Sequence, residues 1–297
     1  MTTEKLIRIL VTITLIEMMA AIGLGVKLED LGRTARNSAL LMRAAIANYF
    51  CVPLVTLGLL LWFSPQPMVS AGFLTVAVCP GAAYGPPFTA IARGNVPAAV
   101  GLMVLLAGSS TILAPFLLQF LLPLMTASRA FGVDVLAIVV TLLLSQFLPL
   151  FVGLSVRKWS PSLSGKFKRP AGTVSTILNL CTLGFIVVAR FGMLAAIHFQ
   201  AFMGMLALVA ATMAAGWLLG ASGSENRIAM TFTTSVRNVA VAPEIATSGS
   251  PRSARCDAVR VYGLSQTLLM AAIALVCGRL EATGSAANEV TSLQNQG

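Results

Sequence analysis

Long apolar runs recur along the whole chain, and each is close to the length that crosses a lipid bilayer. A membrane-spanning helix needs about 20 mostly apolar residues. Charged residues are 10% of the 297 residues, against roughly 25% in soluble domains. The sequence therefore predicts an all-α polytopic membrane protein with nine transmembrane helices and no sizeable soluble domain. The predicted spans cover residues 7–27, 38–63, 68–93, 97–125, 133–156, 172–191, 199–220, 227–247 and 258–279.

Short connections join these spans, so residues 1–297 are predicted to form a single transmembrane domain. Tight turns are expected at Ser64–Pro67 and at Gly220–Ser224. The longest internal loop is expected from Arg157 to Pro170. The tail 280–297 is polar, and a disordered segment is predicted there.

The net charge of +10 reflects basic residues that cluster in the connections. Under the nine-span topology, eleven lie on the side that includes the loop 157–170, and six lie on the other side. Cytoplasmic loops carry the excess of Lys and Arg. We therefore expect an integral protein of the plasma (inner) membrane, with the N-terminus outside and the C-terminus in the cytoplasm.

The third span contains residues that break helices. Its central part, residues 77–89, holds Pro80, Gly81, Gly85, Pro86 and Pro87. Proline lacks a backbone N–H, and glycine loosens the chain. A single proline would indicate a kink in a packing helix, whereas this cluster favours an interruption. Unpaired backbone groups cost several kcal/mol each in hydrocarbon, so the break indicates a binding site inside protein or beside a water-filled cavity.

Arg237 lies near the centre of the eighth span, and two interpretations of it stay open. In one, it neutralises a buried carboxylate, with Glu17 or Glu244 as its partner. In the other, its planar guanidinium faces a central cavity and binds an anionic group of a solute. A salt bridge that opens on solute binding would satisfy both.

Polar residues gather around Arg237 in the sequence. Such side chains often hydrogen-bond to the backbone of their own helix, but their number beside a buried arginine favours a site. Asn48 in the second span must also find hydrogen-bond partners, and either interrupted span could supply them. The polar neighbours of Arg237 are Thr231, Thr233, Thr234, Ser235 and Asn238.

The sequence lacks the patterns of common enzymes and metal sites. His198 is the only histidine, and the five cysteines lack metal or redox spacing. No nucleophile–base arrangement, P-loop or Rossmann glycine pattern occurs. We therefore predict a protein that is not an enzyme and has no metal or cofactor. Its expected partners are the lipid bilayer and a small solute, not nucleic acid.

Three stretches resemble the bile acid:sodium symporter family in type and order. Met19–Asp30 resembles the family's first-repeat helix with its charged loop. Cys79–Gly81 followed by Ala90–Asn95 resembles its broken helix and the basic-Gly-Asn turn. Val236–Asn238 stands where the second broken helix has a Gln-Asn pair.

The resemblance implies inverted repeats and two crossing broken helices. It implies a panel domain of about 7–27, 133–156 and 172–191, and a core domain of about 38–125 and 199–279. Substrate would bind between panel and core, and access would alternate as one domain moves against the other. Members of the family carry bile salts and other organic anions, usually with sodium.

The sodium ligands of the family are not matched here. Gly85 and Pro86 replace a Ser-Asn pair, and Arg237 replaces a glutamine. Sodium requires oxygen ligands, and a fixed guanidinium would repel it. Asn48 is the remaining polar candidate. Further replacements are Ala99 and Met103 for hydroxyl residues and Thr233 for an acidic residue.

We therefore predict a secondary transporter of a small organic anion, bile-salt-like or carboxylated, in which Arg237 replaces the ion. It would be a uniporter, an exchanger or a carrier coupled to protons through Glu17 or Glu244. The alternatives are a sodium-coupled symporter with rearranged ion sites and a transport-dead receptor or scaffold. The predicted substrate- or ion-binding residues are Arg237, Asn238, Thr233, Thr234, Ser235, Asn48, Tyr84, Gly85 and Thr89.

Overall fold

The computed structural model describes residues 3–65, 67–125, 135–189, 199–220, 222–238, 262–263 and 265–279, and the regular elements in these ranges are helices. Four described helices are long and apolar enough to cross a membrane: Lys5–Gly25, Ser38–Phe63, Val96–Met125 and Phe202–Leu219. The protein is therefore an all-helical membrane protein, as predicted, whereas the number of nine spans stays a prediction.

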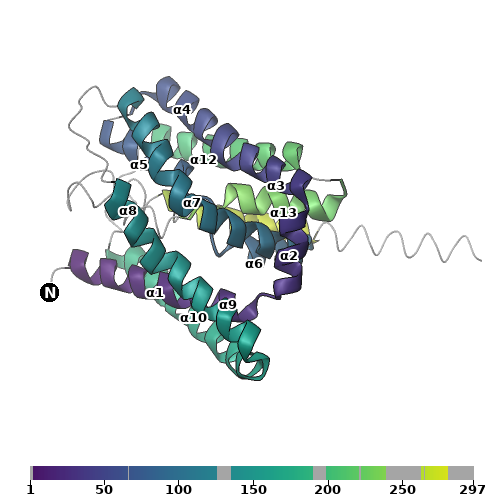
Figure 1. Cartoon of the computed structure of the whole chain (residues 1–297). Helices are drawn as coiled ribbons and strands as arrows, with labels where there is room; N and C mark the ends of the chain where they lie inside the picture. Colours follow the sequence, from purple (N-terminus) through teal and green to yellow (C-terminus); the bar gives the residue numbers. More distant parts are fainter. Residues whose placement is uncertain are drawn as a thin grey trace, which may run out of the picture.

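The first group of helices consists of α1 (Thr3–Gly25), α9 (Leu148–Trp159) and α10 (Pro161–Ala189), which pack along one another (Figure 1). Glycines bring α1 and α9 into backbone contact. A Cβ atom on Gly23 would lie 2.9 Å from the Cα of Gly153, and a Cβ on Gly153 would lie 2.9 Å from the Cα of Gly23. Real Cβ atoms are not found at such distances, so this crossing requires glycine on both helices.

The second group surrounds the interrupted third span. Here α12 packs against α13 and α4, and α13 also contacts α6 and α7. A Cβ atom on Gly216 of α12 would lie 2.7 Å from the Cα of Thr231 on α13, so these two helices also touch through backbone. The helices of this group are α3 (Ser38–Ala45), α4 (Val52–Phe63), α5 (Pro67–Ala77), α6 (Gly85–Ile91), α7 (Val96–Met125), α12 (Phe199–Leu219) and α13 (Ser224–Ser235).

The predicted interruption of the third span is present. Helix α5 ends at Ala77 and α6 begins at Gly85, with residues 78–84 outside any helix. Gly81 has φ 83°, and a Cβ there would lie 2.6 Å from the Cα of Ala107 on α7. Glycine is therefore required by both the backbone conformation and the close packing.

A second helix ends where the eighth span was predicted to be broken. Helix α13 ends at Ser235, and Val236 has the extended values φ −83° and ψ 106°. The backbone N–H of Asn238 donates to the carbonyl oxygen of Cys79 over 2.8 Å. The two non-helical segments therefore meet, and the rest of the eighth span, with Glu244, lies outside the described residues.

Two π-helical turns precede prolines. One is η1 (Ile46–Cys51), between α3 and α4 and just before Pro53; the other is η2 (Leu143–Phe147), between α8 (Val135–Leu142) and α9 and just before Pro149. Proline removes one helical hydrogen bond and crowds the preceding turn, so the wider turn accommodates it. Each π-helical turn contains a buried amide side chain: Asn48 in η1 is 0% exposed and Gln146 in η2 is 1% exposed.

The prediction of a long loop from Arg157 to Pro170 is wrong. Ser160 alone separates α9 from α10, and α10 begins at Pro161. Proline is favoured at the first position of a helix, where its missing N–H is not needed. Pro170 lies within α10 in an exposed stretch, where water or lipid headgroups can pair with the carbonyl it leaves free. The connection before the second span, in turn, contains a short helix, α2 (Leu28–Arg36).

The contact between α1 and α9 leads to a first prediction. Gly153→Ala should destabilise the protein by about 1–3 kcal/mol, because the added methyl group forces the two backbones apart. Gly184→Ala on α10 is the control, since a Cβ there meets nothing within 4 Å. That variant should melt with the wild type or slightly above it, as alanine favours helix. Equal melting temperatures of purified Gly153→Ala and wild type would contradict the tight crossing.

Candidate functional site

Arg237 lies where the two interrupted helices meet, with 2% of its surface exposed. Its Nη1 donates to the side-chain oxygen of Asn48 over 2.6 Å and to the carbonyl of Thr234 over 3.3 Å. Its Nε donates to the carbonyl of Val76 over 3.4 Å, and its Nη2 donates to the carbonyl of Ala77. All three guanidinium nitrogens, Nε, Nη1 and Nη2, therefore donate hydrogen bonds within the protein.

The carbonyls that Arg237 contacts belong to the C-terminal ends of two helices. Val76 and Ala77 are the last two residues of α5, and Thr234 lies in the last turn of α13. The last carbonyls of a helix lack partners in the helix and carry a partial negative charge of about −0.5. The guanidinium therefore occupies the place where two such negative ends converge.

No ion pair joins Arg237 to Glu17 in the described part of the chain; the partners of the guanidinium are neutral oxygens. Of the two predicted charge partners, Glu17 thus does not neutralise Arg237, and Glu244 lies outside the described residues. The positive charge is held by dipoles and an amide rather than by a carboxylate within these ranges.

Amide side chains pair the backbone groups that the end of α13 leaves free. The backbone N–H of Arg237 donates to Oε1 of Gln266 over 3.2 Å, and Nε2 of Gln266 donates to the carbonyl of Arg237 over 3.4 Å. The side chain of Asn238 donates to Oε1 of Gln146 over 3.1 Å. In a membrane interior, where water is not available, such pairs are what make a non-helical segment tolerable.

The structure brings three of the predicted site residues, Arg237, Asn48 and Thr234, into one network, and a fourth, Asn238, lies beside it and bonds Cys79 and Gln146. The side-chain nitrogen of Asn48 donates to the hydroxyl of Thr234 over 3.3 Å and to the carbonyl of Ala44 over 3.0 Å. The network thus joins η1, α13 and the break after α5. Its assignment to a solute or ion site stays a prediction.

Three predicted hydroxyl residues bond within their own helices. Thr233 donates to the carbonyl of Ala229, Ser235 to that of Thr231, and Thr89 to that of Gly85, over 2.7–2.9 Å. Ser and Thr side chains inside helices commonly donate to the carbonyl four residues earlier in this way. In this arrangement, these hydroxyls do not point at the guanidinium.

Gly85 and Tyr84 mark the boundaries of the break. A Cβ on Gly85 would be 3.4 Å from the side chain of Thr233, so the start of α6 packs directly against α13. The hydroxyl of Tyr84 donates to the side-chain oxygen of Asn179 on α10. Tyr84 therefore links the break to the first helix group.

The positions at which the family would have further oxygen ligands are apolar and buried. Ala99 is 0% exposed and Met103 is 1% exposed. Thr233 has a hydroxyl, but it donates to its own helix. These side chains do not add oxygen ligands at the crossing.

Sequence reasoning missed Gln146, Gln266 and Asn179. Each is an amide within a predominantly apolar helix, and a buried amide must find partners. That rule was applied to Asn48 and could have identified these three residues as well. Pro149 near Gln146 was an additional signal for an irregular turn, as Pro53 is near Asn48.

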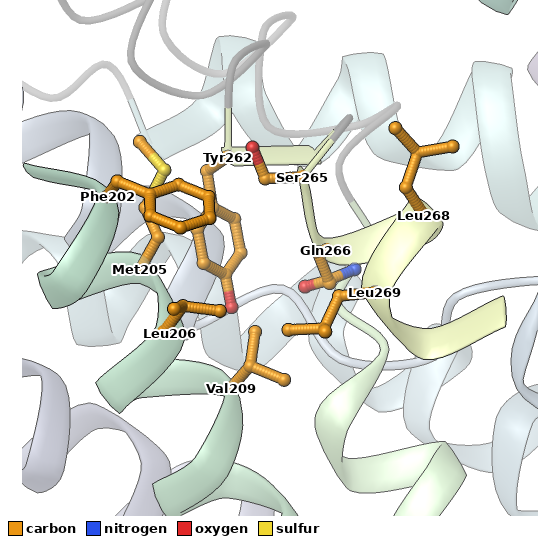
Figure 2. A pocket seen from close by; sticks show the side chains of 9 residues that line it. All are labelled: Phe202, Met205, Leu206, Val209, Tyr262, Ser265, Gln266, Leu268 and Leu269. Atoms are coloured by element: carbon orange, nitrogen blue, oxygen red, sulfur yellow. The ribbon is translucent and has the colours of Figure 1, made fainter. Parts of the chain in front are cut away.

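An apolar cavity of about 280 Å³ lies between α12 and the helix Ser265–Arg279 (Figure 2). Its wall includes Phe202, Met205 and Leu269, with the amide of Gln266 among them. Arg237 lines neither this cavity nor one of about 330 Å³ between α7 and α9. In this conformation the guanidinium lines neither described cavity, and its role in binding a solute stays a prediction.

The two hydrogen bonds between the Gln266 side chain and the backbone of Arg237, here called the Gln266 clamp, lead to a second prediction. Gln266→Leu should lower the melting temperature of the purified protein, because two buried backbone groups of Arg237 lose their partners at about 1–3 kcal/mol each. Thr267→Val is the control, since that hydroxyl bonds only the carbonyl of Gly263 in the described contacts. If both variants melted with the wild type, the clamp would not contribute to stability.

Comparison with known proteins agrees with the resemblance in the sequence. A family model described as the Sodium Bile acid symporter family matches residues 12–197. A Bacillus subtilis (strain 168) protein named "Uncharacterized sodium-dependent transporter YocS" is 27% identical over 147 residues. That alignment covers 50% of this chain and 44% of the relative, so the chain matches less than half of the relative's length. Because the family match covers more than half of the chain, the protein belongs to the sodium bile acid symporter family.

Proposed function

We propose that this protein is a secondary transporter of a small organic anion and that it works without the family's sodium sites. The observation that carries the proposal is the position of the Arg237 guanidinium between the C-terminal ends of α5 and α13. In transporters with broken helices, such ends and the unwound carbonyls coordinate the coupling cation. Here a covalently attached cation takes that place.

Electrostatic repulsion supports the absence of sodium at this point. Two unit positive charges about 4 Å apart repel by about 4 kcal/mol at an effective dielectric constant near 20. The side chains of Ala99 and Met103 offer no oxygen that would offset this cost. A sodium ion beside Arg237 would therefore bind weakly.

The same charge supports an anionic solute. The described partners of the guanidinium are neutral, so its charge still acts on its surroundings. At about 6 Å and the same dielectric constant, the attraction for an anion is at most on the order of 3 kcal/mol, before the partial negative charges of the two helix ends reduce it. Gln146 Nε2 is buried without a partner among the described residues, next to Asn238, and offers a hydrogen-bond donor there. We place the anion between η2 and the point where the two interrupted helices meet.

Transport then follows the scheme that the family implies. The panel would comprise α1, α9 and α10 with the residues 133–147 that precede α9, and the core would comprise the segments 38–125 and 199–279. Relative movement of the two would expose the anion to one side of the inner membrane at a time. The bias of basic residues supports an external N-terminus and a cytoplasmic C-terminus.

A sodium-coupled symporter with a rearranged ion site is the second candidate. It is favoured by the printed name of the Bacillus subtilis relative, which describes that protein as sodium-dependent. The two candidates differ in whether solute binding requires sodium.

Ligand stabilisation separates the candidates. We expect a bile salt or small carboxylate to raise the melting temperature equally in sodium and potassium buffers. At 100 times its dissociation constant, a ligand adds about 2.7 kcal/mol. Stabilisation in sodium buffer alone would favour the rearranged ion site. If no anion in the panel stabilised the protein or entered proteoliposomes, the transport-dead receptor or scaffold would replace the proposal.

Substitution of Arg237 tests the role of its charge. Arg237→Ala should abolish uptake of the stabilising anion into proteoliposomes. Arg237→Lys should recover little of the uptake, because one ammonium group cannot reproduce the planar fork. Arg227→Ala is the matched control from α13, the helix that precedes Arg237, since Arg227 is exposed and stacks on Trp217. Full transport by Arg237→Ala would refute the proposal.

A further inference from the structure

Glu17 is an acidic residue in the middle of a helix that is long and apolar enough to cross the membrane. It lies twelve residues into the span Lys5–Gly25. The other described acidic residues lie at helix ends or on α2: Glu4, Glu29, Asp30 and Glu225. Ionisable groups inside a membrane are costly and indicate a function by default, so a role for Glu17 should be sought.

The carboxyl group of Glu17 is partnered on one side only. The hydroxyl of Ser175 on α10 hydrogen-bonds to it. Its Oε2 atom is buried and has no hydrogen-bond partner in the described part of the chain. An ionised carboxylate in this setting would leave a buried negative oxygen without compensation, whereas a bound proton removes the charge.

The carboxyl group of Glu17 and the break in the third span both contact helix α10. Ser175 and Asn179 are four residues apart on α10 and so share one face of that helix. The side-chain oxygen of Asn179 accepts a hydrogen bond from the hydroxyl of Tyr84, which lies at the break. The side-chain nitrogen of Asn179 donates over 3.2 Å to the sulfur of Met18, the neighbour of Glu17. Glu17 and the break thus meet the same face of α10.

We propose that Glu17 binds and releases the proton that drives solute uptake in this protein. The inference rests on the proposed function, because it supplies the energy source that a carrier without sodium sites needs. A proton from the outer aqueous side binds Oε2 while the protein is open to that side. The carboxyl group stays neutral while the protein with bound solute changes its access, and the proton then leaves to the inner side. One oxygen suffices for a proton, whereas sodium requires several oxygen ligands.

The ionisable side chains of the elements packed against α1 lie toward the ends of the span or are exposed. The Glu17 carboxyl group is therefore the group that can bind a proton in the middle of the span. Helix α1 packs against η2, α9 and α10. The described part of η2 has no ionisable side chain, and α9 has Arg157 and Lys158 in its last turn. Lys168 of α10 lies near Gly25, which is about 12 Å along the helix axis from Glu17. The remaining ionisable groups of α10 are Lys166 and Arg169 near its start and Cys181, which is exposed.

Infrared spectroscopy tests proton binding without knowledge of the solute. The full-length protein should show the C=O stretching band of a buried protonated carboxylic acid, and this band should titrate with pH. Glu17→Gln should lose it, while Glu225→Gln, with its exposed side chain, should keep it. Since Gln is neutral and close in shape to the protonated acid, Glu17→Gln should fold, as its melting temperature will verify. A band unchanged in Glu17→Gln would overturn the proposal.

Transport assays test the coupling, with radiolabelled taurocholate as the probe. In wild-type proteoliposomes, an inward gradient of about one pH unit should support about tenfold accumulation for one proton per anion. Glu17→Gln should show no accumulation but should still exchange internal for external taurocholate. Ser175→Ala should fall in between.

The two assays separate the failure of this inference from failure of the proposed function. Exchange by the wild type without accumulation in a pH gradient would overturn proton coupling and leave the anion carrier intact. Accumulation by Glu17→Gln equal to that of the wild type would also overturn it. Absence of both exchange and accumulation in the wild type would count against the proposed function itself.

Discussion

The contact of Arg237 with the carbonyls of Val76, Ala77 and Thr234 is the interaction on which the centre of this protein depends. Two helices end inside the protein, and each end presents unpaired carbonyls with a partial negative charge. Brought together without a cation, these ends would repel one another. One guanidinium with five donors pairs with three carbonyls from both ends and with Asn48 at once, whereas an ammonium has only three donors.

Amide side chains pair the remaining polar groups at the break, both backbone and side-chain, and this explains why an apolar protein has amides at these positions. Gln266 pairs both backbone groups of Arg237, Asn48 accepts from the guanidinium, and Gln146 accepts from Asn238. Two of these amides lie in π-helical turns upstream of prolines. The irregular turns and the irregular segments therefore support each other, because neither could satisfy its hydrogen bonds alone in hydrocarbon.

Composition and local chemistry were enough to predict the helical membrane class, the interruption near Pro80 and the importance of Arg237. They were not enough to predict where the guanidinium points, because its partners are backbone carbonyls about 160 residues away, which carry no sequence signal. The hairpin at Ser160 was missed because the charged residues after it suggested a loop, although an exposed helix accommodates them equally well. The α1–α9 crossing at Gly23 and Gly153 depends on the distance between two helices, which a glycine alone does not reveal.

A tethered cation differs from a sodium ion in one decisive respect: it cannot leave. In a sodium-coupled carrier, the ion that holds the broken helices together is also the ion whose gradient supplies the energy. Arg237 can perform the first task and not the second, so accumulation of a solute would require a group elsewhere that exchanges its charge with water. Glu17 lies on α1 in the first helix group, separate from the Arg237 network, and its neighbour Met18 accepts a hydrogen bond from Asn179, which in turn accepts one from Tyr84 at the break. The structural and energetic roles of the ion would thus be divided between two side chains, one in each helix group.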